Sequence, residues 1–221
     1  YAYCENNPMN AIDKNGEDSY YLTDGTYICD NLKETDHIYV VSNYNYLKQL
    51  PNGNRVVEFY GKQSLEEAKL SANAFSNIFT NVLKRNGFDV DKLENKSIAV
   101  NVLDNNTKGD GPHYRCIDFY NTTSYPWKNA PIAAISNNKI TVNVVLSDQE
   151  HRNYLSTISN VINVLGVHEY TGHGILKLGS DQHWQILKMQ RAHPSWNNTT
   201  KKLKDLYLQL EKEIPEEYVK H

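Results

Sequence analysis

Residues 166–174 of this chain read GVHEYTGHG, and this stretch decides how the rest is interpreted. It holds two histidines, His168 and His173, with Glu169 directly after the first. Zinc hydrolases commonly carry H-E-x-x-H, in which the histidines stand four apart and share one helix face. Here the spacing is five, which on a straight α-helix separates the two side chains by about 140° instead of about 40°. Binding of one metal ion by both histidines therefore requires a local distortion of the helix.

Two distortions would bring the imidazoles together. A π-bulge widens the turn and places residues i and i+5 on one face. Alternatively, the helix ends at Gly172, because glycine permits the left-handed conformation that closes helices. A buried carboxylate without a partner is costly, so a metal site explains Glu169 better than a structural polar cluster does. A ligand pair formed by Glu169 and His173 alone is a further alternative.

The third ligand must come from a separate element, since catalytic zinc usually takes three protein ligands and one water. The segment 174–179 allows the chain to turn, and a helix is expected from about 181 to 191. His183 is the favoured third ligand because neutral imidazole suits zinc. Asp181 and a distant glutamate are the alternatives.

The pattern H-E-x-x-G-H at residues 168–173 resembles the motif of the dipeptidyl peptidase III type of zinc peptidase. The resemblance covers this motif alone and implies a similar metal-site chemistry. It implies that His168 and His173 bind zinc and that Glu169 polarises the attacking water. That family takes its third ligand as a glutamate from a later helix, and no matching acidic motif follows here.

Peptide hydrolysis at such a site also needs a donor for the oxyanion. Zinc acidifies water and polarises the carbonyl, and Glu169 would act as general base. Tyr170 and His193 are the candidate donors that would stabilise the oxyanion. His193 also fits a simpler role, as a histidine favoured by the dipole at a helix C-terminus.

The first 16 residues carry a second resemblance, to the closing segment of the Rhs-repeat-associated core. That segment has the pattern Y-x-Y-x-x-N-N-P-x-N-x-x-D-x-x-G, and the matching residues are Tyr1, Tyr3, Asn6, Asn7, Pro8, Asn10, Asp13 and Gly16. Lys14 stands where proline is usual. In that family the segment precedes a variable C-terminal toxin or effector domain. The resemblance implies that residues 1–16 end the core and that residues 17–221 form a zinc metallopeptidase toxin domain.

The same resemblance implies where the protein acts and with which partners. It describes a secreted effector released from a larger bacterial Rhs-type protein and acting in a target cell. The expected partners are a protein or peptide substrate and an immunity protein. The net charge of −3 and the lack of a basic run argue against nucleic acid, and no stretch is apolar enough for a membrane span. Cys4, Cys29 and Cys116 form no C-x-x-C and are expected to be free thiols.

The periodicity predicts an α+β fold. A hairpin turns at Asp24-Gly25, and the expected strands are 38–41, 55–60, 97–103 and 139–146. One helix is expected to start at Ser64 and end at Asn86-Gly87, and a second to run from Ser147 to the motif, each opened by a capping box. We expect a zincin-like architecture, with a mixed sheet packed on a helix and a central buried helix carrying the motif. Strand 139–146 is expected at the edge of the cleft, where an extended substrate could pair with it, and the aromatic stretch 113–127 is expected to cover the sheet.

These patterns favour a zinc-dependent peptidase that acts as a secreted polymorphic-toxin effector. One alternative is a metal-dependent nuclease or other hydrolase toxin. The other is a non-catalytic binding domain.

Overall fold

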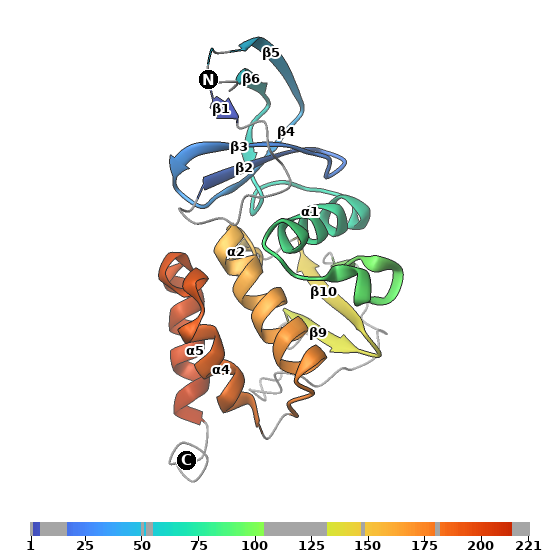
Figure 1. Ribbon diagram of the computed structural model, residues 1–221, viewed down its shortest axis with the longest axis vertical. Helices are drawn as coiled ribbons and strands as arrows, with labels where there is room; N and C mark the ends of the chain where they lie inside the picture. Colours follow the sequence, from blue (N-terminus) through green and yellow to red (C-terminus); the bar gives the residue numbers. More distant parts are fainter. Residues whose placement is uncertain are drawn as a thin grey trace.

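The chain folds into a mixed α+β structure (Figure 1), which confirms the predicted class. The computed structural model describes residues 2–4, 17–49, 51, 55–103, 132–146, 149–179 and 182–213. The strands are β1 Ala2–Cys4, β2 Glu17–Leu22, β3 Tyr27–Glu34, β4 Ile38–Val41, β5 Asn43–Gln49, β6 Arg55–Tyr60, β7 Gln63–Ser64, β8 Ala99–Leu103, β9 Ala133–Ser136 and β10 Lys139–Val145. The helices are α1 Ala72–Arg85, η1 Val90–Lys92, η2 Glu94–Lys96, α2 Gln149–Asn153, α3 Ile158–Val161, η3 Ile162–Ile175, α4 His183–Ala192, η5 Pro194–Asn198 and α5 Lys201–Glu213. No helix in the described part of the chain is long and apolar enough to cross a membrane.

Three small sheets frame the helices. Two of them, ordered β1-β6-β5 and β3-β2-β4-β7, lie at one end of the molecule, and the third is ordered β8-β10-β9. The predicted hairpin at Asp24-Gly25 is confirmed, with Gly25 at a φ of +82° between β2 and β3. In Figure 1 the orange run of α2, α3 and η3 passes between α4 and the yellow strands β9 and β10. This central run carries the histidine motif.

The strand β10 lies in the centre of its sheet. It pairs in parallel with β8, where Val142 faces Val100, and antiparallel with β9, where Ile140 faces Ile135. Because both edges of β10 are hydrogen-bonded, it has no free edge for an added strand. The prediction that 139–146 forms the cleft edge is therefore wrong. The edge strand on this side is β9, which lies against η3.

The first long helix begins later than its capping-box pattern predicts. Ser64 belongs to β7 and pairs with Tyr39 of β4, so its backbone is committed to a sheet. Glu67 closes only a single turn, with its N–H 3.1 Å from the Ser64 carbonyl oxygen. The helix α1 starts after Ser71, whose hydroxyl accepts from the Ala74 N–H at 3.2 Å. It ends at Asn86 and Gly87 as predicted.

The helix predicted to run from Ser147 to the motif is interrupted in the structure. The helix α2 ends at Asn153, and the chain then pairs with the N-terminal part, where the Ile38 N–H donates to the Ser156 carbonyl at 3.4 Å. His37 and Thr157 form an isolated antiparallel bridge at the same place. This extended pairing interrupts the helix. A new helix starts at Thr157, whose hydroxyl accepts from the Asn160 N–H at 3.1 Å.

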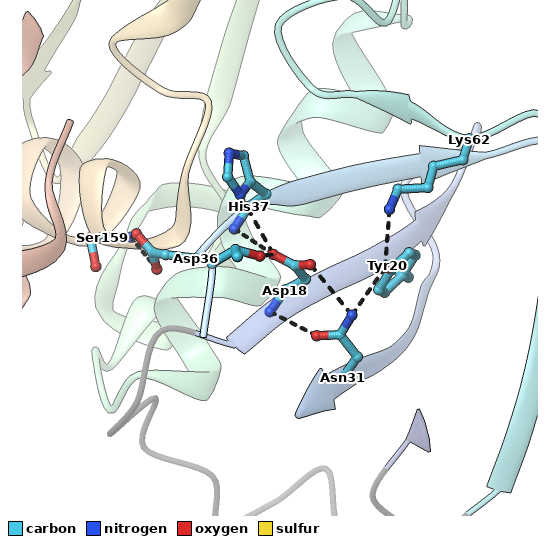
Figure 2. Close-up of polar contacts among 8 residues, drawn as sticks. Asp18, Tyr20, Asn31, Asp36, His37, Lys62 and Ser159 are labelled. Atoms are coloured by element: carbon cyan, nitrogen blue, oxygen red, sulfur yellow. Dashed lines mark hydrogen bonds and ion pairs between the residues drawn. The ribbon is translucent and has the colours of Figure 1, made fainter. Parts of the chain in front are cut away.

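Asp36, which lies far away in the sequence in the N-terminal part of the chain, caps the start of this helix. Figure 2 shows its carboxylate turned toward Ser159, and the Ser159 N–H lies 3.1 and 3.2 Å from the two carboxylate oxygens. The Asp36 carbonyl accepts from the Ile158 N–H at 3.1 Å. With the Thr157 cap, the first three amides of the helix are all satisfied. The N-terminal sheet thus fixes where the motif helix begins.

Asp18 in turn holds the segment that carries Asp36. Its carboxylate accepts from the His37 N–H at 3.0 Å, from the Thr35 hydroxyl and from the Asn31 amide at 3.3 Å (Figure 2). Burial would raise the pKa of Asp18, but these bonds together with the His37 side chain hold it below its usual range. The hydrogen bond to Asp18 raises the pKa of His37 in return. The two side chains form an ion pair, with His37 Nδ1 3.6 Å from the carboxylate.

Cys29 is buried and disulfide-bonded. The prediction of a free thiol is therefore wrong for this residue. Cys116 and the aromatic stretch 113–127 lie outside the described residues.

We predict that Asp36→Gly lowers the free energy of unfolding by about 1–2 kcal/mol, because it removes the carboxylate cap while glycine keeps the positive φ of 59°. The matched control is Asn137→Gly, at an exposed turn residue with a φ of 50°. Urea unfolding should show little change for the control. Equal losses in both variants would show that the capping contact does not stabilise the helix.

We also predict that the stability difference between the wild type and His37→Gln depends on pH. The raised pKa of His37 contributes stability below its unfolded value of about 6.5 and loses it as pH rises through the folded value. The lowered pKa of Asp18 contributes stability above its unfolded value of about 3.8 and loses it as pH falls. Thermal unfolding at a series of pH values should show the largest difference between these two limits. A difference that stays constant from pH 5 to pH 8 would contradict the ion pair.

Candidate metal centre

The wide helix η3 resolves the five-residue spacing of the two motif histidines. The backbone of Ile162–Ile175 forms a π-helix, which continues through Gly172, so the widened turn is the distortion that occurs. The pattern persists at its end, where the Leu176 N–H donates to the carbonyl of Thr171, five residues earlier, at 2.9 Å. His168 and His173 consequently lie on one face, with their Nε2 atoms 3.3 Å apart.

Close packing accompanies the wide helix on two sides. A Cβ on Gly172 would lie 2.9 Å from Cδ1 and Cγ1 of Ile186 in α4, and a Cβ on Gly174 would lie 2.9 Å from Cδ1 of Ile135 in β9. These distances are shorter than ordinary carbon contacts. Glycine at both positions therefore lets α4 and β9 approach η3 closely.

His183 joins the two motif histidines from the first turn of α4. Its Nε2 lies 3.1 Å from Nε2 of His173, and one ligand nitrogen from each of the three rings lies within 4.8 Å of the others. Tetrahedral zinc with bonds of about 2.0–2.1 Å holds its nitrogen ligands about 3.3 Å apart. The three histidines can therefore hold a metal ion. In the described part of the chain no glutamate belongs to this group, and Asp181 lies outside that part.

Hydrogen bonds at the opposite ring nitrogens fix two of the tautomers. His173 Nδ1 lies 2.7 Å from the Leu178 carbonyl oxygen, which can only accept, so Nδ1 carries the proton. His168 Nδ1 lies 3.0 Å from Oε1 of Gln190. The Gln190 amide nitrogen is identified by its position 3.0 Å from the carbonyl oxygen of Asn163. His168 therefore also donates through Nδ1, and both Nε2 atoms carry lone pairs.

Two lone pairs that face each other at 3.3 Å cannot form a hydrogen bond. Burial lowers the pKa of His168 to about 3, so at neutral pH a proton does not bind there. Neutral imidazoles with free Nε2 lone pairs are the form that coordinates metals. A cation between the rings would relieve the repulsion. This convergence is the strongest sign of a metal centre in the described structure.

Glu169 lies beside the histidines in the sequence and is 2% exposed. Its carboxylate accepts from the backbone N–H of Ile135 in β9, and its Oε2 has no hydrogen-bond partner among the described residues. Burial raises the pKa of Glu169 to about 8, which the Ile135 bond only partly offsets. This carboxyl group can therefore take up and release a proton near neutral pH.

Tyr170 and His193 make their hydrogen bonds to groups other than the three histidines. The Tyr170 hydroxyl donates to the Asp89 carbonyl at 3.0 Å, and its ring packs edge-on against Phe88. His193 Nδ1 lies 2.9 Å from the hydroxyl and 3.2 Å from the backbone nitrogen of Ser195. Their roles as oxyanion donors stay predictions.

The sequence interpretation missed Gln190, which is fully buried and contacts His168. A signal was present. Gln190 falls four residues after Ile186 and three after Leu187, on the buried face of α4. A polar residue at an apolar position of a helix needs a partner.

We predict that Gly172→Ala weakens the binding of added metal ions by the three histidines and destabilises the fold by about 1–3 kcal/mol, because the new methyl group pushes α4 and His183 away from η3. Trimming the contacted side chain should relieve the clash, so Gly172→Ala combined with Ile186→Ala should bind the metal better than Gly172→Ala alone. Competition with a chromophoric chelator measures the affinity. Wild-type affinity in the single variant would show that the close contact does not set the position of His183.

No protein-family model, no curated protein and no solved structure matches this chain.

Proposed function

We propose that this protein is a zinc-dependent peptidase. In this proposal His168, His173 and His183 bind the metal and Glu169 is the general base. The observation that carries it is the convergence of three imidazole nitrogens, two of which have their lone pairs directed at each other by outer hydrogen bonds. Imidazole is a favoured ligand of zinc.

The number of ligands supports a catalytic site over a structural one. Structural zinc is usually held by four protein side chains, whereas catalytic zinc has three and an open position. The histidine group has three members in the described part of the chain. Glu169 directly follows His168 in the sequence, and its Oε2 has no partner among the described residues, which leaves this oxygen able to accept a proton.

When bound, zinc would supply Lewis acidity and lower the pKa of coordinated water to about 7. Glu169 would take a proton from the attacking water at Oε2, the oxygen that has no other partner among the described residues. The hydrogen bond from the Ile135 N–H would keep the Glu169 carboxylate in place beside β9 during this transfer. As the carbon–nitrogen bond breaks, Glu169 would return that proton to the leaving amine.

Several features favour a peptide as the substrate. The H-E-x-x-G-H motif resembles that of zinc peptidases, and the pairing of a metal helix with an edge strand, β9, is compatible with a zincin-like fold. The charge of −3 gives no attraction for nucleic acid. The resemblance of residues 1–16 to the Rhs-associated core supports a secreted effector acting in a target cell, with residues 17–221 as its toxin domain and an immunity protein as a partner. The disulfide at Cys29 fits passage through an oxidising compartment.

The test compares purified wild type with Glu169→Gln after loading with zinc. We expect one zinc per chain in both proteins by elemental analysis, and cleavage of a peptide library reduced at least about 100-fold in the variant, because only the general base is lost. Glu94→Gln, which changes an exposed carboxylate, is the control and should cleave as the wild type does. Variants of His168, His173 or His183 to alanine should lose zinc.

Three results would overturn the proposal. Cleavage by Glu169→Gln at the wild-type rate would show that Glu169 is not the general base. Zinc-dependent nicking of plasmid DNA without peptide cleavage would identify a nuclease. A zinc-dependent rise in melting temperature without any hydrolysis would identify a non-catalytic binding domain.

A further inference from the structure

Gln190 joins the two helices that supply the three histidines. It is fully buried in α4, the helix that begins with His183. Its Oε1 accepts from Nδ1 of His168 in η3 at 3.0 Å. Its Nε2 donates to the carbonyl oxygen and the side-chain Oδ1 of Asn163 in η3, at 3.0 and 3.1 Å, and to the hydroxyl of Tyr207 in α5. The Gln190 amide thus contacts η3 at two residues, Asn163 and His168, which lie more than one helical turn apart.

The orientation of this amide is determined by its surroundings. If the amide were flipped, its oxygen would face the Asn163 carbonyl at 3.0 Å, and two acceptors would be opposed. The amide nitrogen would then face His168 Nδ1, which would have to accept. The His168 proton would move to Nε2 and block the metal-facing lone pair. The orientation of Gln190 therefore selects the His168 tautomer that can bind a metal.

Asn163 is held just as firmly. Its side-chain nitrogen donates to the backbone carbonyl of Gln190 at 3.0 Å and to the hydroxyl of Ser195 at 3.2 Å. Asn163 and Gln190 thus form reciprocal bonds between η3 and α4, and both side chains are fully buried. These bonds fix how α4 lies along η3, and with it the place of His183 relative to His168 and His173.

We propose that Gln190 is a positioning residue of the metal centre, which orients the His168 ring, sets its tautomer and holds the two ligand helices together. This inference rests on the proposed zinc site, but its tests do not depend on peptide hydrolysis. Outer-shell partners of ligating histidines typically change metal affinity by about 10–100-fold when removed.

Two substitutions separate the role of the acceptor from the role of packing. Gln190→Met keeps the length of the side chain and removes the acceptor, and we expect zinc affinity to fall by about 10–100-fold. Gln190→Glu keeps one oxygen as the acceptor for His168 Nδ1, and its buried carboxyl group, when protonated, can donate from the other oxygen to the Asn163 carbonyl. This variant should bind zinc within a few-fold of the wild type. Two controls should also keep their affinity: Gln185→Met, on the same helix, and Tyr207→Phe, which removes another partner of Gln190 without touching His168.

The second readout is the nitrogen spectrum of the histidine rings in the metal-free protein. We expect His168 to be the Nδ1–H tautomer in the wild type and to lose that preference in Gln190→Met. The inference is overturned if Gln190→Met keeps wild-type zinc affinity or the wild-type tautomer. It is also overturned if affinity falls in step with metal-free stability across Gln190→Met, Gln190→Glu and Tyr207→Phe, since packing alone would do that. If the wild type binds no zinc, the proposed function fails, and the ring spectra still decide whether Gln190 orients His168.

Discussion

The wide backbone turn of η3 is the constraint on which the whole centre depends. A π-helix is rare and has poorer backbone geometry than an α-helix, so surrounding contacts must stabilise it. Here Ile186 of α4 and Ile135 of β9 press against glycines on two sides of η3. The start of the preceding turn is fixed by Asp36 and Thr157. The fold around η3 therefore holds the two motif histidines on one face.

The electrostatic character of the centre follows from its burial. His168 and Glu169 are both removed from water, and burial keeps the imidazole neutral and favours the protonated carboxyl group. A divalent cation close to the carboxyl group would oppose this preference, because a positive charge stabilises the carboxylate. In the proposed site, metal binding would therefore be linked to the ionisation of Glu169.

The local sequence predicted the grouping of the three histidines better than the elements that carry them. The spacing of His168 and His173 and the nearby His183 pointed to one group, which the structure brings together. The spacing alone left two distortions open, because the choice depends on packing against α4 and β9. The start of the first helix at Ser64 was misplaced, and the continuous helix predicted from Ser147 to the motif is interrupted after Asn153, for a related reason. Ser64 pairs with β4, and the chain before Thr157 pairs with the segment before β4. A capping pattern is local, whereas these pairings join distant parts of the chain. Gln190 was missed because its partners, His168, Asn163 and Tyr207, lie in two other helices.

The contact between Asp36 and Ser159 has a consequence for how this protein can be divided. The segment 17–41 resembles a separate small sheet in Figure 1. It nevertheless supplies Asp36, whose carboxylate accepts a hydrogen bond from the Ser159 N–H in the first turn of the motif helix. A fragment that begins at α1 would contain all three histidines and Glu169 but would expose the first turn of α3 to solvent. Expression trials aimed at the smallest fragment that contains the three histidines should therefore keep β2, β3 and β4. The strands that look detachable hold the start of the helix that leads into the motif.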